Sequence, residues 1–199
     1  MTIGIIGAGL IGTAFARRAA HSNVSAILSN SRGPETLASV VQQIGGSVRA
    51  GTREEAAAQE IVFLAVNWSN IPSALASLPD FGGRIVIDAS NPIEPPTFQP
   101  ADLHGRLSTE VLADYLPGAR VVKAFNHLPA KILAEDPSVH SGRRVLFYAG
   151  ADVKAKAEIA SLIDTLGFFG VDLGGVNDGG RAIAVPGGNL VTLNLVRFG

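Results

Sequence analysis

Short apolar runs recur along the chain, each bounded by glycine, proline, asparagine or serine. Most of these runs lack the polar alternation of a strand that faces water on one side. Strands buried on both faces of a sheet have this composition. The pattern predicts eight strands, at Thr2–Ile6, Val24–Leu28, Ser47–Ala50, Ile61–Val66, Arg84–Asp88, Arg120–Ala124, Val145–Ala149 and Gly170–Leu173.

Helical patterns lie between many of the predicted strands. In the last of them Asp152 is the expected N-cap, an apolar stripe ends at Leu166, and Gly167 is expected to end the helix. Alternation of strands and helices implies right-handed crossovers. The predicted fold class is therefore α/β, a Rossmann-type doubly wound, mostly parallel sheet with helices on both faces and a short C-terminal extension. The predicted helices cover Ile11–His21, Pro34–Ile44, Ser108–Leu116 and Val153–Leu166.

Composition excludes several classes of function. The net charge is −1, and no run of Lys or Arg stands out, which argues against a nucleic-acid or anionic-membrane partner. The absence of Cys excludes disulfides, thiol nucleophiles and Cys-ligated metals, and His21, His104 and His140 show no metal-ligand spacing. The glycine-punctuated N-terminus lacks the basic region of a signal peptide, and no segment approaches the roughly 20 apolar residues of a membrane span. We expect a cytoplasmic protein that acts on a small molecule and uses no metal.

The string "GAGLIG", residues 7–12, joins the first predicted strand to the first predicted helix. In a dinucleotide-binding turn Gly7 permits the tight turn, Gly9 lets the backbone approach a pyrophosphate, and Gly12 lets the helix pack closely on the strand. The pyrophosphate then lies at the positive end of the helix. A glycine-rich turn without a ligand is the alternative, and the position of the motif in the first βαβ unit favours the dinucleotide.

The string "LSNSRG", residues 28–33, follows the second predicted strand. NAD sites place a carboxylate there, roughly 20 residues past the glycines, to bind the ribose 2′-hydroxyl. Here the residues are Asn30, Ser31 and Arg32. An arginine can hold a 2′-phosphate and a serine can donate a further hydrogen bond, so the string predicts NADP(H) rather than NAD(H). An ordinary polar turn with a solvated Arg32 is the alternative.

Polar side chains also follow three later strands, at the sheet edge where ligands bind in open parallel sheets. His127 is the only His near this edge, Asp88 is expected to bond to the backbone, and Lys123 could pair with a carboxylate. This small number of acid–base groups is consistent with hydride transfer between a nicotinamide and a flavin-type ring, because the cofactors carry that chemistry. The strand-end residues are Val66, Asn67 and Trp68, then Ala89, Ser90, Asn91 and Pro92, then Ala124, Phe125, Asn126, His127 and Pro129.

Longer strings cover nearly the whole chain in a familiar order: "GIIGAGLIGTAFARRA", "SNSRGPETL", "IVIDASNP", "LPGARVVKAFNHLPA" and "GADVKAKAEIASLIDTLGFFGVDLG". They resemble the NADP oxidoreductase family named for the deazaflavin coenzyme F420. The cytoplasmic domain of the six-transmembrane ferric reductases is a related relative. The resemblance implies NADPH as cofactor, with a flavin or coenzyme F420 as co-substrate.

The resemblance also implies where the cofactor lies. The loop around Ala8–Ile11 would bind NADPH, Ser31 and Arg32 would bind its 2′-phosphate, and Asn126 and His127 are the candidate catalytic residues that orient the rings. The full set of candidate cofactor-binding residues is Gly7, Ala8, Gly9, Leu10, Ile11, Gly12, Asn30, Ser31, Arg32, Val66, Asn67, Ala89, Asn91, Pro92, Ala124 and Phe125.

The 199 residues suit one domain. We expect a single NADP-binding Rossmann domain over residues 1–199, in which 174–199 is a short extension. That extension is too apolar for a free tail, so we expect it to cover the active-site edge or a homodimer interface. The proline-rich residues 91–105 are either a linker or a loop that covers a site.

Three functions are compatible with these residues. The first is an NADP(H)-dependent oxidoreductase that transfers hydride between NADPH and a flavin or deazaflavin. The second is an NADPH-dependent reductase of a small carbonyl or imine with His127 as proton donor, since such reductions more often need one. The third is a non-enzymatic NADP(H)-binding module, motivated by the few catalytic side chains.

Overall fold

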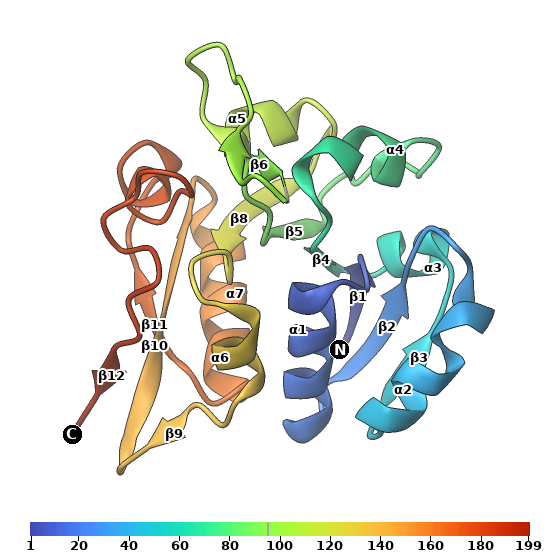
Figure 1. Ribbon diagram of the computed structural model, residues 1–199, viewed down its shortest axis with the longest axis horizontal. Coiled ribbons are helices and arrows are strands. Elements are labelled where there is room, and N and C mark those ends of the chain that lie inside the picture. The colour runs from blue at the N-terminus through green and yellow to red at the C-terminus, as the bar shows by residue number, and fades with distance from the viewer. Residues whose placement is uncertain (95) are drawn as a thin grey trace.

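A computed structural model describes residues 1–94 and 96–199 and shows one twisted central sheet (Figure 1). Its strand order is β11-β10-β8-β5-β4-β1-β2-β3. Neighbouring strands are parallel except β8 and β10, which are antiparallel. The strands are β1 Thr2–Ile6, β2 Ser25–Ser29, β3 Val48–Ala50, β4 Ile61–Leu64, β5 Ile85–Asp88, β8 Arg120–Ala124, β10 Gly142–Gly150 and β11 Phe169–Asp172.

Two helical layers cover the two faces of this sheet. On one face Phe15, Leu133 and Ile159 belong to a core built with α1, α2, α6 and α7, and on the other Leu75 and Leu112 belong to a core built with α3, α4 and α5. The predicted fold class is therefore confirmed. The helices are α1 Leu10–His21, α2 Ala38–Ile44, α3 Arg53–Ala57, α4 Ile71–Leu75, α5 Ser108–Ala113, α6 Ala130–Ala134 and α7 Val153–Thr165, with short 3₁₀ turns at Pro34–Leu37 and Trp68–Asn70.

The eight predicted strands all form, each within three residues of its predicted bounds. Asp152 caps α7 by accepting a hydrogen bond from the Ala155 amide at 2.7 Å, and Gly167 follows the helix with a φ of +90°. The pattern missed three five-residue helices, α3, α4 and α6, and a hairpin of β6 (Ile93–Glu94) and β7 (Gln99–Pro100) inside the proline-rich segment. Two further short strands, β9 (Ser138–Val139) and β12 (Val196–Arg197), pair with β10.

The order of strands reverses beside β1, with β2 and β3 on one side and β4, β5 and β8 on the other. In open α/β sheets the crevice at such a reversal, outside the carboxyl ends of the strands, is where ligands bind. The turn from β1 to α1 lies at this point (Figure 1). The segment after β11 lies at the end of the sheet formed by β10 and β11. There Ile183 and Leu190 pack on Val145 and Phe147 of β10.

Candidate cofactor and active site

The glycine turn between β1 and α1 leaves its backbone open on one side. Gly7 has a φ of +111°, and a Cβ added to it would lie 2.2 Å from the Ala65 carbonyl oxygen. At Gly12 an added Cβ would lie 1.9 Å from the Gly7 carbonyl oxygen, so α1 packs too closely for any side chain. A Cβ at Gly9 would meet no atom within 4 Å, and the first turn of α1 carries no acidic residue. An anion can therefore reach the amides at this helix end.

Two cavities flank the glycine turn and share a wall formed by Gly9, Ala65, Val66 and Asn67. The first has a volume of about 530 Å³ and the second about 330 Å³. The first is further lined by Ile6, Gly7, Ala8, Asn30, Ser31, Arg32, Arg53, Asn70, Ser73 and Ala74. The second is further lined by Leu10, Ile11, Ala89, Ser90, Asn91, Ile93 and Phe98.

The turn after β2 carries Ser31 and Arg32 into the first cavity. Its shape is held by Asn30, whose Oδ1 accepts from the Arg32 amide and whose Nδ2 donates to Thr36 Oγ1, each at 2.9 Å. Ser31 and Arg32 are both exposed, and within residues 1–94 and 96–199 the Arg32 guanidinium forms no salt bridge. Its charge is available to a ligand.

A second arginine of the first cavity, Arg53, was not identified from the sequence. It is the first residue of α3, directly after the N-cap Thr52. Its Nη1 donates to the carbonyl oxygens of Ser73 at 2.8 Å and Ala74 at 3.2 Å, which orients the half-buried side chain between α3 and α4. No short motif marks this residue, because the packing of α3 against α4 brings it to the cavity.

Asn91 joins the wall of the second cavity to the loop after β8. Its Nδ2 donates to the Asn126 carbonyl oxygen at 2.9 Å, and Asn126 Nδ2 donates back to Asn91 Oδ1 at 3.0 Å. Asn126 Nδ2 also donates to the Ile183 carbonyl oxygen at 2.6 Å. Asn126 is buried and lines neither of the two cavities, so it contacts the site through Asn91.

The other candidates after β5 and β8 line neither cavity. Phe125, with a φ of +65°, is fully buried and makes edge contacts with the rings of Phe15 and Phe63, at centroid distances of 5.3 and 5.5 Å. Ala124 belongs to the same core, and Pro92 is buried. These three residues therefore support the site from behind its walls.

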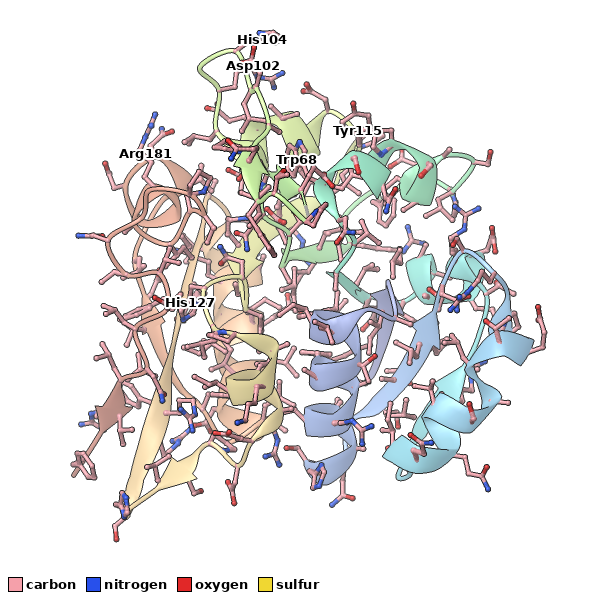
Figure 2. All side chains as sticks on the ribbon, viewed as in Figure 1. Trp68, Asp102, His104, Tyr115, His127 and Arg181 are labelled. Carbon is pink, nitrogen blue, oxygen red and sulfur yellow. The ribbon has the colours of Figure 1, made fainter. Side chains whose placement is uncertain are left out.

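His127 is also buried, with 1% of its surface exposed, on the β10 side of the molecule (Figure 2). Its Nε2 accepts a long hydrogen bond, 3.4 Å, from the Phe147 amide. Burial lowers the pKa of His127 from 6.5 to about 4, so the imidazole is neutral at pH 7. A neutral ring that lines neither cavity is poorly placed to donate a proton there.

Among the described residues no group of three or more His, Asp or Glu side chains is arranged to hold a metal ion. None of the helices in the described part of the chain is both long enough and apolar enough to cross a bilayer.

The strand order, the glycine turn and the paired cavities define a Rossmann-type dinucleotide-binding protein. The model of the family "NADP oxidoreductase coenzyme F420-dependent" matches residues 2–92. The crystal structure of the hypothetical protein SMa0349 from Sinorhizobium meliloti is 47% identical, with a TM-score of 0.93 over 99% of this chain and 96% of that one. Residues 2–92 therefore belong to the coenzyme F420-dependent NADP oxidoreductase family.

Two further relatives extend this comparison. A protein of Arthrobacter sp. FB24, provisionally assigned as an F420-dependent NADP reductase, is 26% identical, with a TM-score of 0.73 over 89% of this chain and 86% of that one. The metalloreductase STEAP3 of Rattus norvegicus is 31% identical over 186 residues, which are 92% of this chain. The chain spans only 36% of the length of that metalloreductase.

Proposed function

We propose that this protein transfers hydride between NADP(H) and a flavin or deazaflavin such as coenzyme F420. The observation that carries the proposal is the pair of cavities on either side of the glycine turn, one lined by arginine and serine and the other largely apolar. NADP(H), when bound, supplies the hydride, and the protein supplies binding and orientation.

The first cavity suits the adenosine half of NADP(H). Ser31 and Arg32 reach it from the turn after β2, and Arg53 reaches it from α3. Its described lining residues include no Asp or Glu, so a phosphate meets cations and hydroxyls there without a repelling carboxylate. Ser31 and Arg32 would hold a 2′-phosphate, and the backbone at Ala8 and Gly9 would hold the pyrophosphate.

The second cavity suits the nicotinamide and a flat acceptor ring. Leu10 and Phe98 line it although 83% and 64% of their surfaces are exposed, so both present apolar area to an incoming molecule. Asn67 and Asn91 supply amide groups for orientation. We propose that Asn126 acts through Asn91. The family name and the assignment of the Arthrobacter relative support a ring acceptor.

The small-carbonyl alternative has less support from the geometry. The described lining of the second cavity contains no His, Lys, Tyr, Asp or Glu that could protonate a substrate oxygen or nitrogen. His127, the predicted proton donor of that alternative, lies outside both cavities. Transfer to a conjugated ring depends mainly on stacking and orientation, which the apolar cavity can provide.

An acceptor panel tests the proposed function. NADPH oxidation would be followed with FMN, FAD, coenzyme F420, a small ketone and a cyclic imine, each repeated with NADH. We expect multiple turnovers with at least one ring acceptor and with NADPH preferred. Turnover of the ketone or imine alone would contradict the proposal, and NADPH binding without oxidation by any acceptor would support a binding module instead.

A further inference from the structure

A fully buried ion pair lies next to the wall of the second cavity. Lys123 Nζ is 2.8 Å from Asp88 Oδ2, and the two side chains are 1% and 0% exposed. Asp88 and Lys123 face each other in register on the parallel strands β5 and β8. Removing two charges from water costs several kcal/mol per ion, and a well-packed apolar pair is often equally stable. The stability of the sheet therefore does not by itself account for the pair.

Both charged groups also bind Ser90, two residues beyond Asp88. Lys123 Nζ donates to the Ser90 carbonyl oxygen at 2.8 Å. Asp88 Oδ1 accepts from the Ser90 amide at 3.0 Å and from its hydroxyl at 2.6 Å. The amide, the carbonyl and the side chain of Ser90 are thus all held by the ion pair. We name Asp88, Ser90 and Lys123 the Ser90 anchor.

The anchor fixes one end of a short stretch of the cavity wall. Ala89, Ser90 and Asn91 are consecutive lining residues of the second cavity. The Asn126 amide holds the far end through Asn91. The wall on this side is therefore tied to β8 and to the loop after it by side-chain hydrogen bonds. A wall held in this way needs no rearrangement when a ligand binds.

We propose that Asp88 and Lys123 are positioning residues, which hold Ala89–Asn91 in the geometry that the nicotinamide half of the cofactor meets. This inference rests on the proposed function. It assigns to the buried pair a role in orienting the cofactor, although neither charged group contacts the substrate. Loss of the anchor should weaken binding of the nicotinamide half and slow hydride transfer, while the adenosine half binds as before.

The test uses the double variant Asp88→Leu/Lys123→Met, which removes both charges and leaves apolar side chains in their place. The matched control is Lys156→Met/Asp172→Leu, a more exposed pair outside both cavities. Four quantities would be measured. They are the melting temperature, the dissociation constant of NADPH, the dissociation constant of 2′,5′-ADP, which is only the adenosine half, and kcat with the ring acceptor found by the panel.

We expect the double variant to melt within a few degrees of the wild type, because no unpaired charge is left behind. Its affinity for 2′,5′-ADP should change less than about twofold, while NADPH binds roughly tenfold more weakly and kcat falls on the order of 10- to 100-fold. A purely structural pair would lower binding of both ligands together or of neither. The control should match the wild type in all four quantities.

Ser90→Ala gives a second test, which holds even when the double variant does not fold. It removes only the hydroxyl that donates to Asp88, and we expect a loss of several-fold in kcat with unchanged binding of 2′,5′-ADP. The positioning role would be overturned if a folded double variant kept wild-type NADPH affinity and turnover. If the double variant does not fold, the same result in Ser90→Ala would overturn it. A wild-type protein that binds no NADPH would instead overturn the proposed function, and this inference with it.

Discussion

At the scale of single residues, we expect cofactor choice to depend on the Arg32 guanidinium, which forms no salt bridge with the residues that the structure describes. Arg32 lines the first cavity from a turn that Asn30 holds in shape. We expect Arg32→Ala to weaken NADPH binding by on the order of 1.5–3 kcal/mol, the scale of a hydrogen bond between charged groups, and to leave NADH binding unchanged. Arg181→Ala, at an exposed arginine outside both cavities, is the control. Equal weakening of both dinucleotides, or of neither, would contradict the assignment to the 2′-phosphate.

The burial of His127 predicts how the free energy of unfolding depends on pH. Its pKa is about 4 in the folded protein, whereas an unfolded chain takes up the proton near pH 6.5. Because the unfolded state binds more protons between these values, stability is fully present above pH 6.5 and is lost as the pH falls toward 4, by about 3 kcal/mol at most. Urea unfolding at pH 7 and pH 4.5 should show this loss in the wild type and a smaller one in His127→Gln.

An identical pH dependence in the wild type and His127→Gln would show that another group is responsible. The same variant also tests the catalytic role predicted for this residue. We expect its kcat with a ring acceptor to stay close to the wild-type value, because the imidazole lies outside both cavities. A large loss of kcat with the ring acceptor would instead support the predicted role of His127 in orienting the rings.

At the scale of elements, the β6–β7 hairpin gives the second cavity part of its wall. Glu94 accepts hydrogen bonds from the Ser69 amide at 2.5 Å and the Ser69 hydroxyl at 3.0 Å, which ties the hairpin to the loop after β4. Phe98 lines the cavity from this hairpin. Stacked aromatic rings contribute roughly 0.5–1.5 kcal/mol, so Phe98→Ala should raise the KM of a ring acceptor about 2- to 10-fold.

The dissociation constant of NADPH should stay nearly unchanged in Phe98→Ala, and Tyr115→Ala, at an exposed aromatic residue outside both cavities, should change neither quantity. Weaker NADPH binding with an unaltered acceptor KM would place the hairpin at the cofactor instead. Steady-state kinetics together with fluorescence titration separate these outcomes.

The lengths of the elements explain which of them could be predicted from the sequence. The buried strands stand out as continuous apolar runs with clear ends, and α7 is long enough for an apolar stripe. Each was predicted to within three residues of its observed bounds. The helices α3, α4 and α6 have five residues each, little more than one turn, so no apolar period can emerge. The capping box of Thr52 and Glu55 was the one local signal that α3 offered.

The residues of the candidate site also differ in whether a local sequence signal marks them. The glycine turn and the Ser31–Arg32 turn are contiguous in sequence and could be predicted from motifs. Arg53 and the pairing of Asp88 with Lys123 depend on helix packing and on strand register, which no contiguous string specifies. The burial of His127 escaped prediction for the same reason, since the residues that cover it come from β10 and from the segment after β11.

At the scale of the whole molecule, the C-terminal residues connect the far edge of the sheet to the loop after β8. The Thr192 amide donates to the His127 carbonyl oxygen at 2.9 Å, and Ile183 accepts from Asn126. Leu195 and Phe198 nevertheless remain 43% and 60% exposed. We expect sedimentation equilibrium of the wild type to give twice the mass of one chain. The Phe198→Asp variant should give the mass of a single chain. A monomeric wild type would contradict the predicted homodimer.

Among the described residues, four line both cavities and form their shared wall: Gly9, Ala65, Val66 and Asn67. The turn with Ser31 and Arg32 contacts one cavity, and the hairpin with Phe98 contacts the other. Substitutions in the Ser31–Arg32 turn therefore leave the residues of the hairpin unchanged, and the reverse also holds. Under the proposed function, an engineer could change the preference for NADPH over NADH at the turn and the acceptor at the hairpin in separate steps.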